Sequence, residues 1–287
     1  MKELTYEEVL DQIEHQRRFG NRPGAEVSAL MLEKLGRPQQ NMSVIHIAGT
    51  NGKGSVSAFL CSILKEAGIR TGMFTSPHLV DFRERICVDG QMISCEEVTK
   101  LGNMLLEEDF GTVPTMFDYC LAMALLYYRD RQCQAAVIET GLGGRLDSTN
   151  AIGVPEVTVV TKIGYDHMAV LGDIKKGTKL VLESQEKDAM DVLLETAEKE
   201  AVTEIKIADM HDVTECRYEN GRQYFSYQKY KNLEMAMLGV HQYENAAAAI
   251  LAAEIFLKDR GISDEKAEYY IREGIKKTRW EGRMWRH

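Results

Sequence analysis

The chain has 287 residues, 44% of them hydrophobic and 28% charged, a composition typical of a soluble globular protein with one large or two small domains. Its formal net charge of −9 argues against general nucleic-acid binding, although a local group of N–H donors could still hold an anion. No run approaches the roughly 20 apolar residues that span a bilayer, and the acidic, amphipathic start does not read as a secretory signal. Six scattered cysteines without a C-x-x-C pair indicate reduced thiols. We therefore expect a cytoplasmic monomer without membrane or nucleic-acid partners.

Apolar periodicity and capping residues predict strands that alternate with helices. The apolar run at 43–48 is typical of a buried parallel strand, and a helical pattern follows the next glycines until Gly68. Ser94 and Glu97 form a capping-box pattern that opens a helix to about residue 108. We expect a helical segment over 1–42 and strands at 43–48, 70–76, 135–140 and 157–164. Further helices are expected at 94–108, 116–130, 239–261 and 263–278. A hairpin with an Asn-Gly turn is expected from about 213. The predicted fold class is α/β: a mostly parallel P-loop-type sheet flanked by helices, with a small antiparallel hairpin or sheet near 213–238.

The stretch HIAGTNGKGSVSAFL, residues 46–60, has the strand, glycine turn and helix that a phosphate-binding loop requires. It departs from the usual G-x-x-x-x-G-K-[ST] pattern, because Ile47 stands where the first glycine is expected and Gly54 directly follows Lys53. Its glycines permit positive φ and close backbone approach, so N–H groups at the helix start could face phosphates while Lys53 neutralises their charge. The alternative interpretation is a glycine-rich turn that binds no ligand.

Other polar residues stand where ligands commonly bind. Glu139 closes an apolar strand, and the carboxyl ends of parallel strands face the ligand crevice, where a carboxylate suits Mg²⁺ beside a triphosphate. His167 comes a few residues after the next strand, although a histidine is an unexpected magnesium ligand and alone would be interpreted as structural. Phe117 could stack on a ring system, but an aromatic in an apolar helix is more often part of the core. Asp147 lies in a loop of glycines and short polar residues that could orient a ligand.

Residues 46–60 resemble the ATP loop of the Mur ligase superfamily, and specifically of its folate branch, folylpolyglutamate synthase/dihydrofolate synthase, which normally carries this variant spacing. Further stretches support the resemblance in the same order along nearly the whole chain: RFGNRPG, TSPHLVDFRERI, FDYCLAMAL, ETGLGGRLDSTN, KIGYDHMAVLGD, GVHQYENAAAA and WEGRM. The succession of TNGKGS and ETGLGGRLDSTN is highly specific to this branch. The variant loop is therefore interpreted as a different version of the phosphate loop.

The resemblance implies a role for particular residues. Lys53, Glu139 and His167 would be catalytic, and the metal would be Mg²⁺ on Ser76, Glu139 and His167. ATP would contact Gly49, Thr50, Asn51, Gly52, Lys53, Gly54 and Ser55, together with Asn245 near the adenine and Arg283. The pterin side of the substrate would contact Phe117, Asp118, Tyr119, Cys120, Leu146, Asp147 and Ser148. Phe117-Asp118 replaces the usual Phe-Glu of the family, so the side chain that carries the carboxylate is one methylene shorter.

The implied activity is ATP-dependent ligation of L-glutamate to the carboxylate of a reduced folate or dihydropteroate through an acyl phosphate. Two departures from the family support an alternative, a non-catalytic remnant that binds ATP and a pterin. The segment that bears a carbamylated lysine is missing after VLGD, and the chain stops at WEGRMWRH, where family members continue into a second domain. The resemblance implies that residues 1–287 form the Mur-ligase-type central ATP-binding domain, including the helical segment 1–42, without the C-terminal glutamate-ligase domain. The loop alone would also permit another P-loop NTPase.

Overall fold

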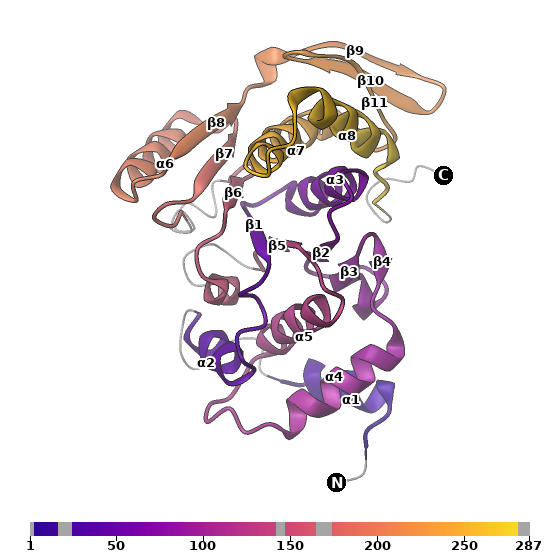
Figure 1. Cartoon of the computed structure of the whole chain (residues 1–287), viewed down its shortest axis with the longest axis vertical. Coiled ribbons are helices and arrows are strands. Elements are labelled where there is room, and N and C mark those ends of the chain that lie inside the picture. Colours follow the sequence, from indigo (N-terminus) through magenta and orange to yellow (C-terminus); the bar gives the residue numbers. More distant parts are fainter. Residues whose placement is uncertain (1–2, 17–24, 142–146, 165–173, 281–287) are drawn as a thin grey trace.

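The computed structural model describes residues 3–16, 25–141, 147–164 and 174–280. Figure 1 shows a central sheet with helices on both faces and a separate three-stranded sheet at one end. The strands are β1 (Ser43–Ala48), β2 (Thr71–Phe74), β3 (Ile86–Val88), β4 (Gln91–Met92), β5 (Ala135–Glu139), β6 (Val157–Val160), β7 (Lys179–Glu183), β8 (Glu204–Ala208), β9 (Val213–Glu219), β10 (Arg222–Tyr227) and β11 (Tyr230–Met235). The α-helices are α1 (Tyr6–Glu14), α2 (Glu26–Lys34), α3 (Lys53–Glu66), α4 (Cys95–Glu107), α5 (Met116–Asp130), α6 (Lys187–Lys199), α7 (His241–Lys258) and α8 (Asp264–Lys277). Short 3-10 helices are η1 (Phe82–Arg85), η2 (Ser148–Ile152) and η4 (Met210–Asp212).

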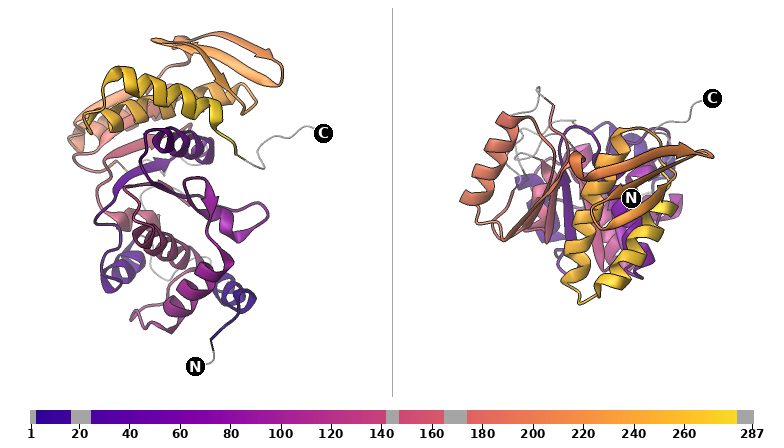
Figure 2. Two further views of the ribbon diagram at one scale, coloured as in Figure 1. Left: turned by 45° about the vertical axis from the view of Figure 1, so that its right-hand side comes forward. Right: turned by 90° about the horizontal axis from the view of Figure 1, so that it is seen from above.

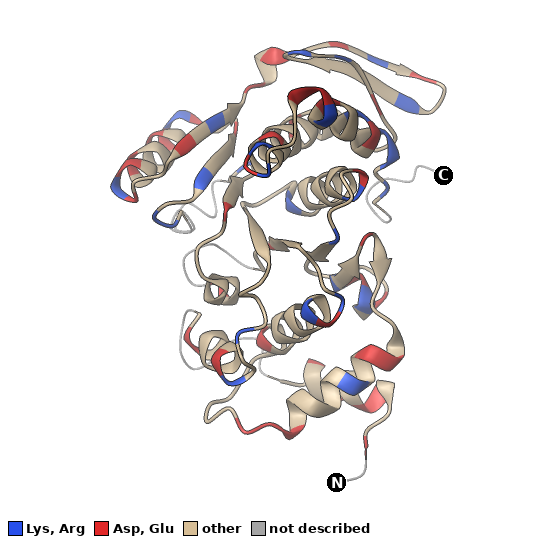
Figure 3. Cartoon of the chain, in the orientation of Figure 1, with Lys and Arg blue, Asp and Glu red and all other residues tan. Residues whose placement is uncertain are grey.

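The large sheet has the strand order β4-β3-β2-β5-β1-β6-β7-β8, and all its pairs from β2 to β8 are parallel. The predicted α/β class is therefore confirmed. The β3–β4 hairpin pairs antiparallel to β2 at one edge, which the sequence did not indicate because both strands are very short. The central strand β1 lies between β5 and β6 and contains no Lys, Arg, Asp or Glu, in agreement with the tan colour of this region in Figure 3.

Two layers of helices cover the sheet. Ile45 and Ile47 of β1 face a core shared with α3, α7 and α8, whereas Val44 faces the opposite core with α1, α2, α4 and α5. This alternation follows from the two-residue period of a strand, which sends successive side chains to opposite faces. Figure 2 shows α3 and α8 on one side of the sheet, with α4 and α5 beyond it. None of the helices in the described ranges combines the length and the apolar character needed to cross a membrane.

The small antiparallel sheet has the order β11-β10-β9, and Asn220 and Gly221 form the predicted turn between β9 and β10 with positive φ. Phe225 of this sheet packs its ring edge against Tyr243 of α7, with 5.3 Å between ring centroids. The sheet therefore covers the outer side of the helical layer, and the predicted antiparallel unit is confirmed with β11 as an additional strand.

Candidate active site

The turn between β1 and α3 requires glycine at two positions. Gly49 has φ +127° and Gly52 has φ +92°, values that L side chains rarely adopt. A Cβ at Gly52 would lie 2.3 Å from Oδ1 of Asn245, and one at Gly49 would lie 2.2 Å from Oγ1 of Thr161. Gly52 is the N-cap of α3, and glycine has no side chain with which to cap the helix. The start of α3 therefore has the electropositive character of a helix N-terminus, which favours anions.

Lys53 and Glu139 meet beside this turn. The Nζ atom of Lys53 lies 3.0 Å from the carbonyl oxygen of Gly49 and 3.8 Å from Oε1 of Glu139. The Lys53 side chain is 12% exposed and that of Glu139 is 3% exposed, so both charges lie in a poorly solvated environment. A Cβ at Gly54 would lie 3.5 Å from Oε2 of Glu139, an ordinary contact distance, so the carboxylate also lies next to the second residue of α3. The fold thus brings together two residues that are 86 positions apart in the sequence.

Ser76 and Glu139 lie at the carboxyl ends of the neighbouring parallel strands β2 and β5. Phe74 is paired with Ile138 in the parallel β2–β5 ladder, so the chain reaches Ser76 just beyond the strand end that carries Glu139. The Oγ atom of Ser76 is buried and has no hydrogen-bond partner within the described part of the chain. A hydroxyl and a carboxylate at neighbouring strand ends are the oxygen donors that Mg²⁺ prefers. His167 lies outside the described residues.

The segment that follows β6 is hydrogen-bonded to the predicted phosphate-binding loop, mainly through main-chain atoms. The carbonyl oxygen of Lys162 accepts hydrogen bonds from the N–H groups of Thr50 and Asn51, at 3.0 and 3.3 Å. The N–H of Gly164 in turn donates to Oγ1 of Thr50, at 2.9 Å. The predicted ATP contacts Thr50 and Asn51 therefore direct their N–H groups toward the protein, which leaves the start of α3 as the donor group of the loop. These contacts run mainly through main-chain atoms, so no residue pattern in the sequence indicates them.

Glu183, the last residue of β7, accepts a hydrogen bond from the segment that follows β6. Its Oε2 accepts from the N–H of Lys162 at 2.7 Å, and the side chain is 1% exposed. Burial, and then the nearby Glu244, raises the pKa of Glu183 to about 8. Burial also raises the pKa of Glu244. One oxygen of each carboxyl, Oε1, is buried without a partner among the described residues.

Asn245 approaches the loop from α7 as part of a buried amide chain. Its Nδ2 donates to Oε1 of Gln242 at 3.0 Å, and Nε2 of Gln242 donates to Oγ of Ser55 at 3.3 Å. This chain joins the first turn of α7 to the first turn of α3. Gln242 was not among the predicted site residues, although its position three residues before Asn245 places both on one helix face. The predicted ATP contact Arg283 lies outside the described residues.

The residues predicted for the pterin side lie at the start of α5 and at η2. Phe117 is half-buried, its ring centroid lies 5.5 Å from that of Phe74, and a Cβ at Gly141 would lie 2.6 Å from its ring. Tyr119 is 7% exposed, and Cys120 is completely buried in the core. These two side chains point into the helix packing. Leu146 lies outside the described residues.

Asp118 is a buried hydrogen-bond acceptor for three hydroxyl groups. Its Oδ2 accepts from the N–H and the Oγ1 of Thr115 in a capping box at the start of α5. Its Oδ1 accepts from Ser148 at 2.7 Å and also from Ser28 of α2. The carboxylate therefore joins α2, α5 and η2. Its predicted contact with substrate stays a prediction, and the geometry gives Asp118 an organising role at this side of the site.

Asp147 organises the other side of the same segment. Its Oδ2 accepts from the N–H of Gly141 at 2.8 Å, and its Oδ1 accepts from the N–H and the Oγ1 of Thr149, at 2.9 and 2.6 Å. The hydroxyl of Thr149 also lies 2.8 Å from Nε2 of His46 in β1. His46 belongs to the loop motif, but no pattern in the sequence indicates a role for its ring.

Comparisons with known proteins show which family this chain resembles. Residues 47–253 match the Mur ligase middle domain. A Bacillus subtilis dihydrofolate synthase/folylpolyglutamate synthase is 36% identical over 98% of this chain, and the match covers 70% of that protein. A folylpolyglutamate synthase of Arabidopsis thaliana is 37% identical over 77% of this chain, and the match covers only 39% of that protein. The chain thus spans from well under half to about two thirds of these curated relatives.

Solved structures give the same result. A folylpolyglutamate synthase from Thermotoga maritima superposes with a TM-score of 0.82 and 33% identity, covering 97% of this chain and 67% of that one. A complex of FPGS with AMPPCP and folate superposes with a TM-score of 0.87 and 28% identity, covering 98% of this chain and 73% of that one. The chain belongs to the Mur ligase superfamily, in its folylpolyglutamate synthase/dihydrofolate synthase branch.

Proposed function

We propose that this chain is the ATP-binding domain of a carboxylate–amine ligase that joins L-glutamate to a reduced folate or dihydropteroate. The observation that carries the proposal is the meeting of Lys53 and Glu139 beside the start of α3, where the N-cap residue is Gly52. Membership of the folate branch supports the substrate class, since a related structure is a complex with AMPPCP, an ATP analogue, and folate.

The proposed reaction has two steps. The substrate carboxylate attacks the γ-phosphorus of ATP, the bond to the β,γ-bridging oxygen breaks, and ADP leaves behind an acyl phosphate. The amine of glutamate then attacks the acyl carbon, loses a proton, and displaces inorganic phosphate as the amide forms. The first N–H groups of α3 and the Lys53 ammonium would orient and stabilise the transferring phosphoryl group, because such transfers depend on positioning and charge stabilisation.

The described residues at the strand ends fit a magnesium ion. The buried Ser76 hydroxyl has no protein partner in the described ranges, and the Glu139 carboxylate ends the neighbouring strand. We propose that these two oxygen donors, with His167, hold Mg²⁺. When bound, the ion would supply charge neutralisation to the phosphates. Glu139 also lies within 3.8 Å of Lys53, which orders the ammonium for the same phosphates.

Phosphate release tests the proposal on the full chain. With ATP, Mg²⁺, a reduced folate and L-glutamate, we expect phosphate release that requires all of the substrates. Lys53→Met should lower the rate roughly 10²- to 10³-fold, the effect of removing one charge-stabilising group. Lys65→Met is the matched control, because Lys65 lies exposed at the opposite end of α3 and should leave the rate unchanged. Tight binding of ATP without release would favour a non-catalytic remnant, and release without folate or glutamate would favour an NTPase. Both results contradict the ligase.

A further inference from the structure

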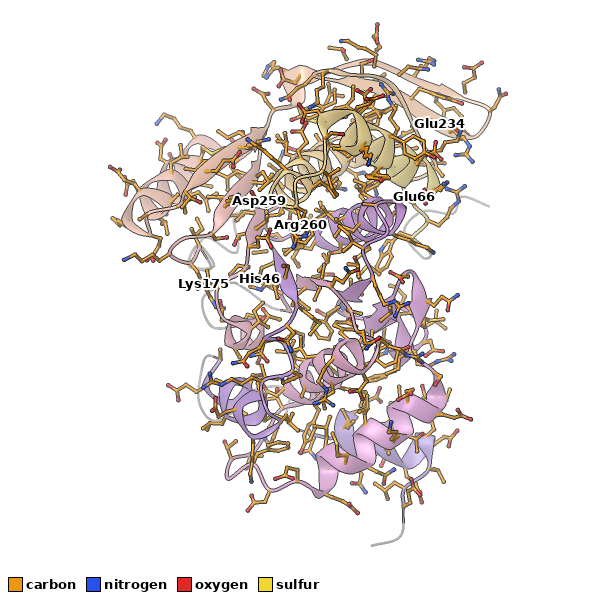
Figure 4. All side chains as sticks on the ribbon, in the orientation of Figure 1. His46, Glu66, Lys175, Glu234, Asp259 and Arg260 are labelled. Carbon is orange, nitrogen blue, oxygen red and sulfur yellow. The ribbon has the colours of Figure 1, made fainter. Side chains whose placement is uncertain are left out.

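His46 is a polar ring in the middle of the central strand. It is 0% exposed, and because its neighbours Ile45 and Ile47 both face the core shared with α3, α7 and α8, the His46 ring lies on the other face of the sheet, on the side of Val44. Burial, with a smaller contribution from the charge of Lys175, lowers the pKa of His46 to about 3, so the ring is neutral at physiological pH. Figure 4 labels His46 in β1 and Lys175 in the loop region beside it. A neutral imidazole buried here needs a hydrogen-bond partner, because an unsatisfied buried polar group is costly.

That partner is the hydroxyl of Thr149, 2.8 Å from Nε2 of His46. The single hydroxyl hydrogen of Thr149 is directed to Oδ1 of Asp147, at 2.6 Å. The Thr149 oxygen must therefore accept its hydrogen bond from His46, which places the ring proton on Nε2. The Nδ1 atom then carries a lone pair, in agreement with the absence of a partner for Nδ1 among the described residues.

The chain of contacts continues from Asp147 toward the aromatic ring at the pterin side. Oδ2 of Asp147 fixes the N–H of Gly141 at 2.8 Å. The ring of Phe117 lies against Gly141 so closely that a Cβ there would be 2.6 Å from the ring. A displaced Asp147 would therefore release Gly141, and Gly141 sets the position of the Phe117 ring.

We infer that His46 is a positioning residue for the acceptor substrate, acting through Thr149 and Asp147 on Gly141 and Phe117. This inference rests on the proposed function for the identity of the substrate but not for the existence of the relay. The neutral ring with its proton on Nε2 is the fixed end of the relay, because β1 is hydrogen-bonded on both sides, to β5 and to β6. The ATP side does not depend on it, since none of the relay hydrogen bonds involves residues 49–55.

Histidine NMR tests the relay without any substrate. In protein labelled with ¹⁵N-histidine, the signal lost in the His46→Gln variant identifies His46 among the seven histidines. We expect a neutral ring protonated on Nε2, unchanged across the neutral pH range. A proton on Nδ1, or a charged ring near neutral pH, would overturn the relay.

Calorimetry on the full chain then tests its consequence. Thr149→Val removes the hydroxyl and should weaken folate binding roughly 10- to 100-fold, the range for a lost hydrogen bond to a charged group. Binding of the ATP analogue AMPPCP should stay within about twofold. Thr149→Ser keeps the hydroxyl and should restore folate binding, which also guards against a valine variant that fails to fold. Equal loss of both ligands, or no loss of folate binding, would refute the positioning role. If the wild-type chain binds folate but releases no phosphate, the ligase proposal fails while the relay stands.

Discussion

Replacing Glu183 by glutamine should make the protein more stable, and increasingly so as the pH rises. The carboxyl is buried, accepts from the N–H of Lys162, and lies near Glu244. Glutamine has the shape of the protonated acid and its oxygen can accept the same hydrogen bond. The variant therefore removes the ionisable group while it keeps the contact to Lys162.

The sign follows from proton binding in the two states. Between pH 4.5 and about 8 the folded protein keeps a proton on Glu183 that the unfolded chain has released, so stability falls as the pH rises through this window. A tenfold difference in acid strength corresponds to about 1.4 kcal/mol, so the full loss is about 4–5 kcal/mol above pH 8 and only about 1 kcal/mol near pH 5. Lys162 opposes the effect, because its charge and its N–H favour the carboxylate.

Urea unfolding at about pH 5 and about pH 9 measures the difference. The gain in the free energy of unfolding of Glu183→Gln over wild type should be about 3–4 kcal/mol larger at the higher pH. Glu198→Gln on α6 is the matched control, since Glu198 is exposed, and its effect should be small and independent of pH. If Glu183→Gln changes stability by the same amount at both pH values, Glu183 does not keep its proton in the folded protein.

Two further substitutions test the packing of the site. Gly52→Ala should weaken AMPPCP binding at least about tenfold in calorimetry, because alanine at φ +92° is strained and its Cβ would overlap Oδ1 of Asn245; undiminished binding would contradict this account of the turn. Asp118→Ala should lower the free energy of unfolding by about 2–4 kcal/mol, because it removes a cap and leaves buried hydroxyls unpaired. Asp130→Ala at the exposed end of α5 should cost less than about 0.5 kcal/mol, and an equal effect of both variants would show that Asp118 has no special role.

The sequence predicted those parts of the fold that depend on local pattern. The apolar run of β1 and the glycines after it sufficed to predict a strand, a turn and a helix, because each has its own period or backbone requirement. The Asn220-Gly221 turn likewise identified the β9–β10 hairpin. The β3–β4 hairpin was missed, since strands of three and two residues carry no detectable alternation.

Long-range side-chain and main-chain contacts could not be predicted in the same way. The bond from His46 to Thr149 joins residues that are 103 positions apart, and the carbonyl of Lys162 acts through an atom that every residue has. Asp118 is intermediate, because Thr115 stands three residues before it at the spacing of a capping box. That local signal favoured a structural role for Asp118, whereas the resemblance to the family directed attention to the substrate.

The strand β1 also determines how far apart the two halves of the site can be. His46 stands three residues before Gly49, a span of about 10 Å in an extended chain. This separation is rigid, because neighbouring strands hold β1 along both edges. Deleting one residue between them would shorten the spacing by about 3.3 Å and turn His46 toward the opposite helical layer. β1 therefore works as a molecular ruler, and its length matters as much as the side chains it carries.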